Sequence, residues 1–168
     1  MCSRIKDKTG FISNNCTSHQ DMRNSNTSGN QFLIRHNLTN MELILKDNHS
    51  QKWNWLLEVL KHCPKLQNLS IHEDSYGGNG LVDNWMNPPI VPECLSTQLK
   101  TCLLNVYTFM ECGVQFAKYI MQNSKVLNTM SVKTGFFIDI TAKHDMIKKL
   151  ALSRRPQQHV NSYLIDDS

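Results

Sequence analysis

One apolar template recurs four times along this chain of 168 residues, and it constrains the fold more than any other feature. The template reads Leu-x-x-Leu-x-Leu, with other apolar residues allowed at its later positions. Its copies are Leu38, Met41 and Leu43; Leu66, Leu69 and Ile71; Leu99, Cys102 and Leu104; and Leu127, Met130 and Val132. The numbers of the leading leucines differ by 28, 33 and 28 (66 − 38, 99 − 66, 127 − 99), so a shift of 61 in the numbering (99 − 38) superposes the first two copies on the last two. A random leucine-rich sequence would seldom keep that register, and the alternation in each copy predicts a short strand.

Apolar residues at helical spacing fill the first and third intervals between the copies. The two stripes are Trp53, Leu56, Leu57 and Leu60, and then Phe116, Ala117, Ile120 and Met121. Ser50 is placed to cap the first helix, and Pro64 follows its end. Thr108 and Glu111 have the Thr-x-x-Glu spacing of a capping box at the start of the second. The chain therefore alternates strands with helices.

Parallel strands that are joined by helices cross over in the right-handed sense, and repetition of that unit gives a curved array. The two shorter steps of the template also fall within the range typical of leucine-rich repeats. We therefore predict an α/β fold: a short leucine-rich-repeat-like βα solenoid with a curved, mainly parallel sheet and helices on the convex side. Two βα units are few for such an array. A further alternative is therefore that this short array does not fold stably by itself.

The remaining segments differ in composition from this array. Residues 1–30 are rich in Ser, Asn, Thr and Asp without a period, which predicts a disordered polar arm. Residues 73–98 are rich in proline and glycine and show no helical period, which predicts a long loop. A third helix is expected over residues 141–152, with Thr141 as N-cap and Met146, Ile147 and Leu150 on its buried side. Residues 156–168 form a tail in which His159–Ile165 is a candidate last strand.

Composition and targeting signals exclude several classes of protein. The start of the chain lacks the apolar core of a signal peptide, and no run of eighteen apolar residues occurs, so we expect a cytoplasmic or nuclear protein. The six cysteines contain no CxxC pair, so neither a metal site nor a cofactor is expected. The net charge of +4 is mildly basic, and only residues 143–155 are dense in Lys and Arg. That segment is predicted to be a solvated helix face, with nucleic-acid binding as the alternative.

The reactive residue types give no constellation for catalysis. Cys94 follows Glu93 in a proline-flanked turn, but nothing nearby supplies a base or an oxyanion hole, so we interpret it as an apolar plug. Cys102 stands at a core position of the third strand. No enzyme is predicted. Among the tryptophans, Trp53 is expected in the core and Trp55 at its margin or at an interface. Trp85 is expected to fix the proline loop over the end of the sheet.

Residues 85–101 carry a specific resemblance. WMNPPIVPECLSTQLKT resembles the signature of the FBD domain, which occurs in plant F-box/LRR-repeat proteins. The matching positions are Trp85, Pro88, Val91, Pro92, Cys94, Leu95, Leu99 and Lys100. The chain then divides into the polar arm (1–30), a terminal leucine-rich βα unit (31–79), an FBD (80–155) and the tail (156–168).

The resemblance implies a part in ubiquitin ligation. In that family the F-box docks on a Skp-type adaptor of a cullin ligase, and the repeats and the FBD are thought to hold the substrate. Residues 1–30 contain nothing like an F-box, and the repeat array is far shorter than usual. Direct adaptor binding is therefore not expected. The chain would be a truncated, even non-functional, family member, a gene fragment, or a competitor for the substrate of a full-length relative.

The predicted solenoid also nominates a binding surface for an unknown protein substrate. Side chains alternate across a strand, so those between the core positions face the concave side. They are Asn40, Glu42, Ile44, Asn68, Ser70, His72, Thr101, Leu103, Asn105, Thr129, Ser131 and Lys133. This mixed polar set with a few apolar anchors suits contact with protein better than with phosphate. The alternative is a merely solvated face.

Overall fold

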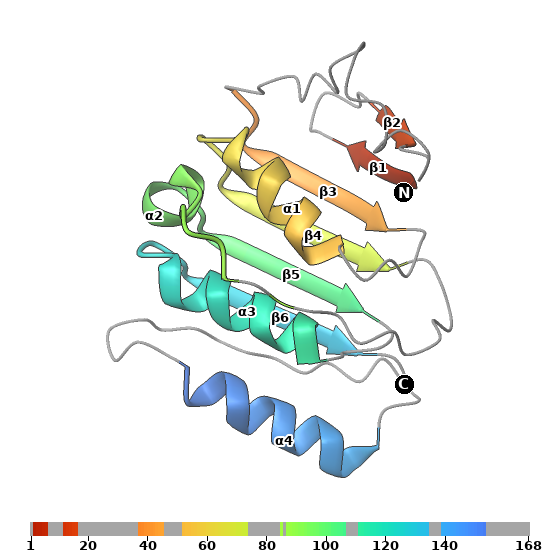
Figure 1. Ribbon diagram of the computed structural model, residues 1–168, viewed down its shortest axis with the longest axis vertical. Helices are drawn as coiled ribbons and strands as arrows, with labels where there is room; N and C mark the ends of the chain where they lie inside the picture. The colour runs from red at the N-terminus through yellow and green to blue at the C-terminus, as the bar shows by residue number, and fades with distance from the viewer. Residues whose placement is uncertain are drawn as a thin grey trace.

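A computed structural model describes residues 2–6, 12–16, 37–45, 52–73, 85, 87–106, 111–134 and 139–153, the first two segments as backbone alone. The fold is mixed α/β. Its sheet has the strand order β2-β1-β3-β4-β5-β6, and four helices accompany it in the described part of the chain (Figure 1).

The four template copies form the parallel part of the sheet. β3 (Asn40–Leu45), β4 (Asn68–Glu73), β5 (Thr101–Val106) and β6 (Thr129–Thr134) are neighbours in that order. Two rows of core side chains cross all four strands in register: Met41, Leu69, Cys102 and Met130, and then Leu43, Ile71, Leu104 and Val132. The predicted parallel sheet is therefore confirmed.

The leading leucines are also aligned, beside a repeated turn. Thr39 accepts hydrogen bonds at its carbonyl from the amides of Gln67 and Asn68, at 2.8 and 3.0 Å. The carbonyls of Gln67 and Lys100 accept the corresponding pairs from the next strand along. Leu38, Leu66, Leu99 and Leu127 are all buried beside these turns, with exposed fractions of 8, 0, 0 and 2%. The repeat in the sequence therefore corresponds to a repeat in the structure.

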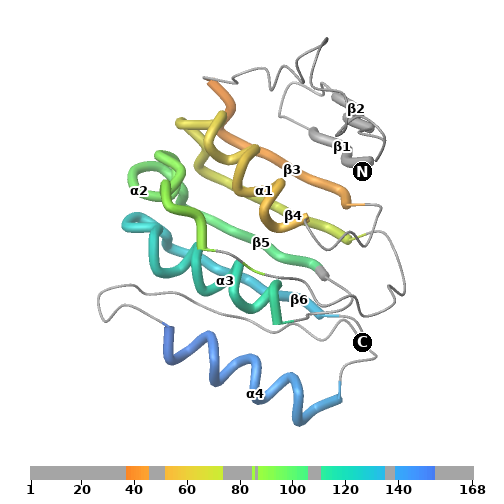
Figure 2. The backbone as a smooth tube through the Cα atoms, viewed as in Figure 1, coloured from red at the N-terminus to blue at the C-terminus, as the bar shows by residue number. Residues whose placement is uncertain are grey.

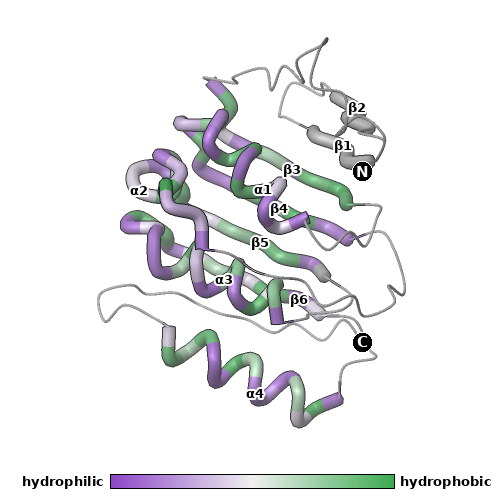
Figure 3. The backbone as a smooth tube through the Cα atoms, in the orientation of Figure 1, coloured by the Kyte–Doolittle hydropathy of each residue, from purple (hydrophilic) through white to green (hydrophobic). Residues whose placement is uncertain are grey.

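Two helices cover one face of the parallel strands (Figures 1 and 2). They are α1 (Lys52–Lys61) and α3 (Glu111–Asn123), and both predicted apolar stripes are buried. The rings of Trp53 and Phe116 stack at a centroid distance of 4.8 Å and join the two helices. Trp55 is half-buried against the same core. Hydrophilic and hydrophobic stretches alternate along both helices (Figure 3), as one-sided burial requires.

A short helix within the proline-rich segment was not predicted. α2 (Glu93–Thr97) follows Pro92, a residue type whose fixed φ suits the start of a helix. So short a helix cannot show a helical period, so the pattern gave no signal there. The prediction of a loop over residues 73–98 is therefore wrong at residues 93–97, which are helical. The first residue of the predicted loop, Glu73, is the last residue of β4, and residues 74–84 lie outside the described residues.

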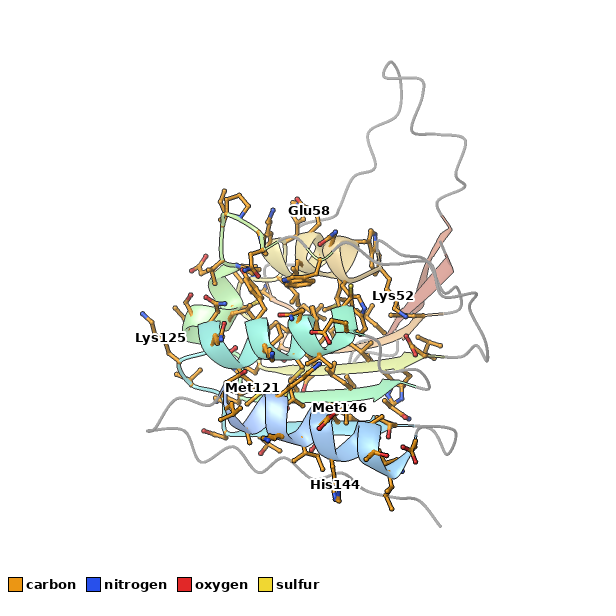
Figure 4. All side chains as sticks on the ribbon, turned by 60° about the horizontal axis from the view of Figure 1, so that its bottom comes forward. Lys52, Glu58, Met121, Lys125, His144 and Met146 are labelled. Atoms are coloured by element: carbon orange, nitrogen blue, oxygen red, sulfur yellow. The ribbon has the colours of Figure 1, made fainter. Side chains whose placement is uncertain are left out.

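The third predicted helix is confirmed as α4 (Ile140–Ala151), with two corrections. Asp139 is the N-cap, and Thr141 lies inside the helix, where its hydroxyl donates a hydrogen bond to the Asp139 carboxylate. Met146 and Leu150 are buried as expected, but Ile147 is 37% exposed. Among the described helices and strands α4 packs chiefly beside α3 (Figure 4), and Met146 and Leu150 are the buried positions of this helix.

Two strands occur within the predicted polar arm. β1 (Cys2–Lys6) and β2 (Ile12–Cys16) pair antiparallel, and β1 also pairs antiparallel with β3. The disorder prediction is therefore wrong for these two segments. Strand addition at a sheet edge is driven by backbone hydrogen bonds, which need no apolar period in the sequence.

Several predictions fall outside the described residues. They concern the rest of the arm to residue 30, the caps at Ser50 and Thr108, and the tail with its candidate strand His159–Ile165. Within the described ranges, no helix is both long and apolar enough to cross a membrane.

Candidate interaction surface

The face of the parallel strands that α1 and α3 leave uncovered carries all twelve predicted binding residues. We call this the open face. In β3, β4 and β6 these side chains alternate with buried ones, and all twelve are partly or fully exposed. The parallel register arranges them in three rows across the strands: Asn40, Asn68, Thr101 and Thr129; Glu42, Ser70, Leu103 and Ser131; and Ile44, His72, Asn105 and Lys133.

The first row is a ladder of side-chain hydrogen bonds near the strand starts. Asn68 Nδ2 donates to Asn40 Oδ1 at 2.7 Å, and Thr101 Oγ1 donates to Asn68 Oδ1 at 2.6 Å. Asn40 Nδ2 donates in turn to Thr39 Oγ1 at 2.7 Å. Each bond holds its neighbour in one rotamer, so this row is an ordered polar border.

The middle row contains Glu42, two serines and one apolar side chain, Leu103. Leu103 stands between Ser70 and Ser131 on the neighbouring strands. Leu103 is partly exposed on this face. A partner that covered Leu103 would remove apolar area from water, which stabilises a complex by roughly 25 cal/mol per Å² buried.

The third row and Glu42 carry the charge of the open face. The His72 ring lies with Nε2 4.0 Å from Glu42 Oε1 and Nδ1 3.5 Å from Asn105 Nδ2. Lys133 stands on the last parallel strand, at the far end of the row from Ile44. The acidic Glu42 and the basic Lys133 therefore lie toward opposite edges of the open face.

Two lysines at the strand starts add to the border and were missed from the sequence. Lys65 Nζ donates to Asn37 Oδ1 at 3.1 Å, and Lys100 Nζ donates to Gln67 Oε1 at 3.2 Å. Lys65 lies in the turn before β4, and Lys100 directly precedes β5. The position of these lysines shortly before a predicted strand could have indicated them. The alternation of side chains, which predicted the other surface residues, applies only within strands.

A buried ion pair at the opposite ends of the strands was also missed. Lys52, at the start of α1, bonds through Nζ to the carboxylate of Glu73, at the end of β4, and both side chains are 5% exposed. The Lys52 ammonium also lies 5.3 Å from the centroid of the Trp53 ring. Figure 4 shows Lys52 at the first turn of α1. The pair ties the first helix to the second parallel strand.

The cysteines of the FBD-like segment are buried as predicted. Cys94 and Cys102 are 0 and 1% exposed. Burial raises the pKa of each thiol to about 12, with the nearby Cys63 adding to the effect at Cys94. A thiol that stays protonated at neutral pH is a poor nucleophile and a poor metal ligand. In the described ranges no group of three His, Cys, Asp or Glu residues is placed to hold a metal ion.

Four of the FBD signature residues, Pro92, Cys94, Leu95 and Leu99, are buried at or beside α2 and form what we call the FBD plug. Leu95 and Leu99 are 0% exposed, and the Cys94 carbonyl accepts hydrogen bonds from the amides of Gln98 and Leu99 at 2.9 and 2.8 Å. Trp85 contacts the rings of Phe116 and Tyr119 edge-on, at 6.2 and 5.8 Å. Trp85 therefore packs onto α3, and its role in fixing the proline loop over the end of the sheet stays a prediction.

One basic residue of α4 is paired with a carboxylate of α3, on the helix-covered side of the sheet. Lys149 Nζ bonds to Glu111 Oε2 of α3 at 2.9 Å, and Asp145 lies among the lysines in the sequence of the helix. His144 points away from the rest of the molecule (Figure 4). Pairing and mixed charge make this a weak phosphate-binding surface. Arg154 and Arg155 lie outside the described residues.

Together these features define a class of protein: a parallel βα array covered by helices on one face, with an ordered polar surface on the other. Comparison with known proteins narrows the class, because residues 87–132 match the family model named FBD. Over about half to two thirds of its length the chain is also similar to F-box/FBD/LRR-repeat proteins of Arabidopsis thaliana.

Individual relatives from Arabidopsis thaliana show how far the similarity extends. The F-box/FBD/LRR-repeat protein At4g00160 is 33% identical over 87 residues, which cover 49% of this chain and 19% of that protein. The F-box/FBD/LRR-repeat protein At3g52680 is 31% identical over 102 residues, covering 58% of this chain and 22% of that protein. The chain thus matches about a fifth to a quarter of the length of such relatives. No solved structure matches it significantly.

Proposed function

We propose that this protein is a non-catalytic protein-interaction module whose open face binds a segment of another protein. The observation that carries the proposal is the alignment of twelve mixed side chains in three rows on that face. Such a surface offers hydrogen-bond donors and acceptors at fixed spacing, one central apolar anchor and separated charges. These features suit a polypeptide, which presents backbone amides, apolar side chains and both signs of charge.

The proposed architecture is a short leucine-rich-repeat-like solenoid, with the open face on its concave side. The regular steps of the template and the repeated turn hydrogen bonds support it. In this proposal the module corresponds to the substrate-recognition end of an F-box protein of an SCF-type ubiquitin ligase. The FBD match and the names of the relatives support that assignment.

The test compares two double variants of the chain as bait for partner capture. Ser70→Arg with Ser131→Arg places bulk and charge beside Leu103 on the open face. Asn54→Arg with Gln122→Arg adds the same charge at exposed positions of α1 and α3, and serves as the matched control. A protein captured by the unmodified chain should be lost with the first variant and retained with the second. Retention by the first variant would reject the open face as the binding site.

A further inference from the structure

Each of the turns that lead into β4, β5 and β6 carries an exposed lysine. Lys65 lies before β4, Lys100 directly precedes β5, and Lys125 lies before β6. The first residues of the four parallel strands pair with one another across the sheet, so these turns lie at one end of the molecule (Figure 1). We call these three lysines the basic rim.

Hydrogen bonds to neutral amides position two lysines of the basic rim. Lys65 Nζ donates to Asn37 Oδ1 at 3.1 Å, and Lys100 Nζ donates to Gln67 Oε1 at 3.2 Å. Each bond reaches back to the turn before the neighbouring strand. Lys125 points away from the body of the molecule (Figure 4). An ammonium group has three donors, so one bond to an amide oxygen leaves both its charge and further donors available.

The carboxylates on the neighbouring helices do not neutralise the basic rim. Glu58, in α1, is bonded to Lys61 of the same helix at 2.7 Å. Glu93, the first residue of α2, is exposed. In the described part of the chain no ion pair joins a carboxylate to a lysine of the basic rim. This end of the sheet therefore carries an excess of exposed positive charge.

The basic rim adjoins the polar border of the open face. Lys100 directly precedes Thr101, whose hydroxyl donates to Asn68 Oδ1 at 2.6 Å. Lys65 stands three residues before that asparagine in the sequence. A polypeptide that lies on the open face and continues past the strand starts would therefore reach the lysines next.

We propose that the basic rim binds an acidic segment of the partner polypeptide, whose Asp or Glu side chains pair with the three lysines. This inference rests on the proposed function, because it names the kind of segment that the module selects. Complementary charge of this kind speeds association and disfavours partners that carry positive charge at the same place.

The spacing of the lysines favours carboxylates over the phosphates of a nucleic acid. Neighbouring strands lie about 4.8 Å apart, whereas double-stranded DNA carries about one charge per 1.7 Å along its axis. Amide side chains, Gln67 and Asn128, stand at the positions before β4 and β6 that Lys100 occupies before β5. Such amides both donate and accept hydrogen bonds, which suits a peptide backbone.

Fluorescence anisotropy with defined probes tests the proposal on the unmodified chain. The acidic probe is a labelled peptide of alternating Glu and Gly, and the neutral probe is the corresponding peptide of Gln and Gly. The chain should bind the acidic probe and not the neutral one. Lys65→Gln with Lys100→Gln should weaken binding of the acidic probe by about fivefold or more, because two ion pairs are lost.

The matched control is Lys118→Gln with Lys148→Gln, which removes the same net charge from α3 and α4. This variant should bind the acidic probe within about twofold of the unmodified chain. Equal weakening in the two variants, or no binding of the acidic probe to the unmodified chain, would overturn the proposal. Tighter binding of a labelled oligothymidylate, lost in the rim variant, would assign the basic rim to nucleic acid and overturn it as well.

The acidic probe also separates this proposal from the proposed function. It carries no apolar side chain to cover Leu103, so its binding reports on the basic rim alone. The capture experiment with Ser70→Arg and Ser131→Arg reports on the open face. A failure of one surface is therefore distinguishable from a failure of the other.

Discussion

Cys94 and Cys102 illustrate how burial decides the role of a residue in this fold. Both lie in the core, Cys102 between Leu69 and Met130 on neighbouring strands, and Cys94 with its Sγ 3.6 Å from the Leu60 carbonyl oxygen. Their contribution is packing, as the alternation pattern predicted for Cys102. The pKa values near 12 follow from that packing.

These thiols predict a loss of stability at alkaline pH. The folded-state pKa of about 12 lies above the ordinary value of 9.0, so the folded state keeps the proton while the unfolded state releases it. The contribution of these thiols to the free energy of unfolding should therefore be constant below pH 9 and fall as the pH rises from 9 towards 12, by up to about 1.4 kcal/mol per thiol per pH unit. Urea titrations at pH 8, 9 and 10 measure this slope. Cys102→Val should make the slope shallower, and an unchanged slope would show that the thiol is not desolvated.

Tyr119 carries a buried polar group. This residue is 5% exposed beside Trp85, and its hydroxyl has no hydrogen-bond partner in the described part of the chain. Burial also raises the pKa of this hydroxyl. A buried polar group without a partner costs free energy, which the aromatic packing of the ring must offset.

Tyr119→Phe is expected to leave stability unchanged or to raise it by up to about 1 kcal/mol, because it removes an unsatisfied oxygen and keeps the ring. Thermal unfolding of the purified variant at neutral pH is the measurement. Tyr119→Ala is the matched comparison and should lose about 3 kcal/mol through the cavity it creates. Destabilisation of the phenylalanine variant by more than about 1 kcal/mol would mean that the hydroxyl has a partner.

At the scale of elements, periodic segments were predictable and isolated contacts were not. The four strands and the two covering helices follow from side chains that repeat at strand and at helical spacing. α2 is too short to have a period, and β1 gains its place through backbone hydrogen bonds to β3. Residues 74–84 contribute nothing to this comparison, because they lie outside the described residues.

The candidate site also has features that the sequence predicts and features that it does not. Alternation within strands predicted which side chains share the open face, but the Asn68 ladder depends on the register between strands, which alternation leaves open. The pair of Lys52 and Glu73 joins residues that are distant in the sequence and lie on different elements. Neither residue stands out locally, so tertiary packing alone brings them together.

The Lys52–Glu73 pair gives a prediction about how α1 is attached to β4. Glu73→Leu should destabilise the fold by about 3–5 kcal/mol, because it leaves the Lys52 ammonium buried without its carboxylate. The double variant Lys52→Met with Glu73→Leu should recover most of that loss, since no buried charge remains. Chemical denaturation of the unmodified chain and the two variants, together with Lys52→Met alone, measures the coupling. Additive losses in the double variant would contradict a direct interaction between the two side chains.

At the scale of the whole molecule, the two faces of the sheet have separate roles. One face is buried under α1 and α3 and accounts for stability, and the FBD signature around α2 belongs to that side. The open face contributes little to the core, so its side chains are available for contact. In the proposed function, changes on the open face alter binding without unfolding the chain, whereas changes in the FBD plug act through folding.

Carbene footprinting of the chain, free and bound to a partner captured as described above, tests the proposed role of the open face most directly. In the complex, carbene labelling of Ile44 and Leu103 on the open face is expected to be lower than in the free chain. Labelling at Trp55, on α1, and at Ile90, shortly before α2, should stay the same. The opposite pattern, with protection at Trp55 and Ile90 and unchanged labelling at Leu103, would contradict the account.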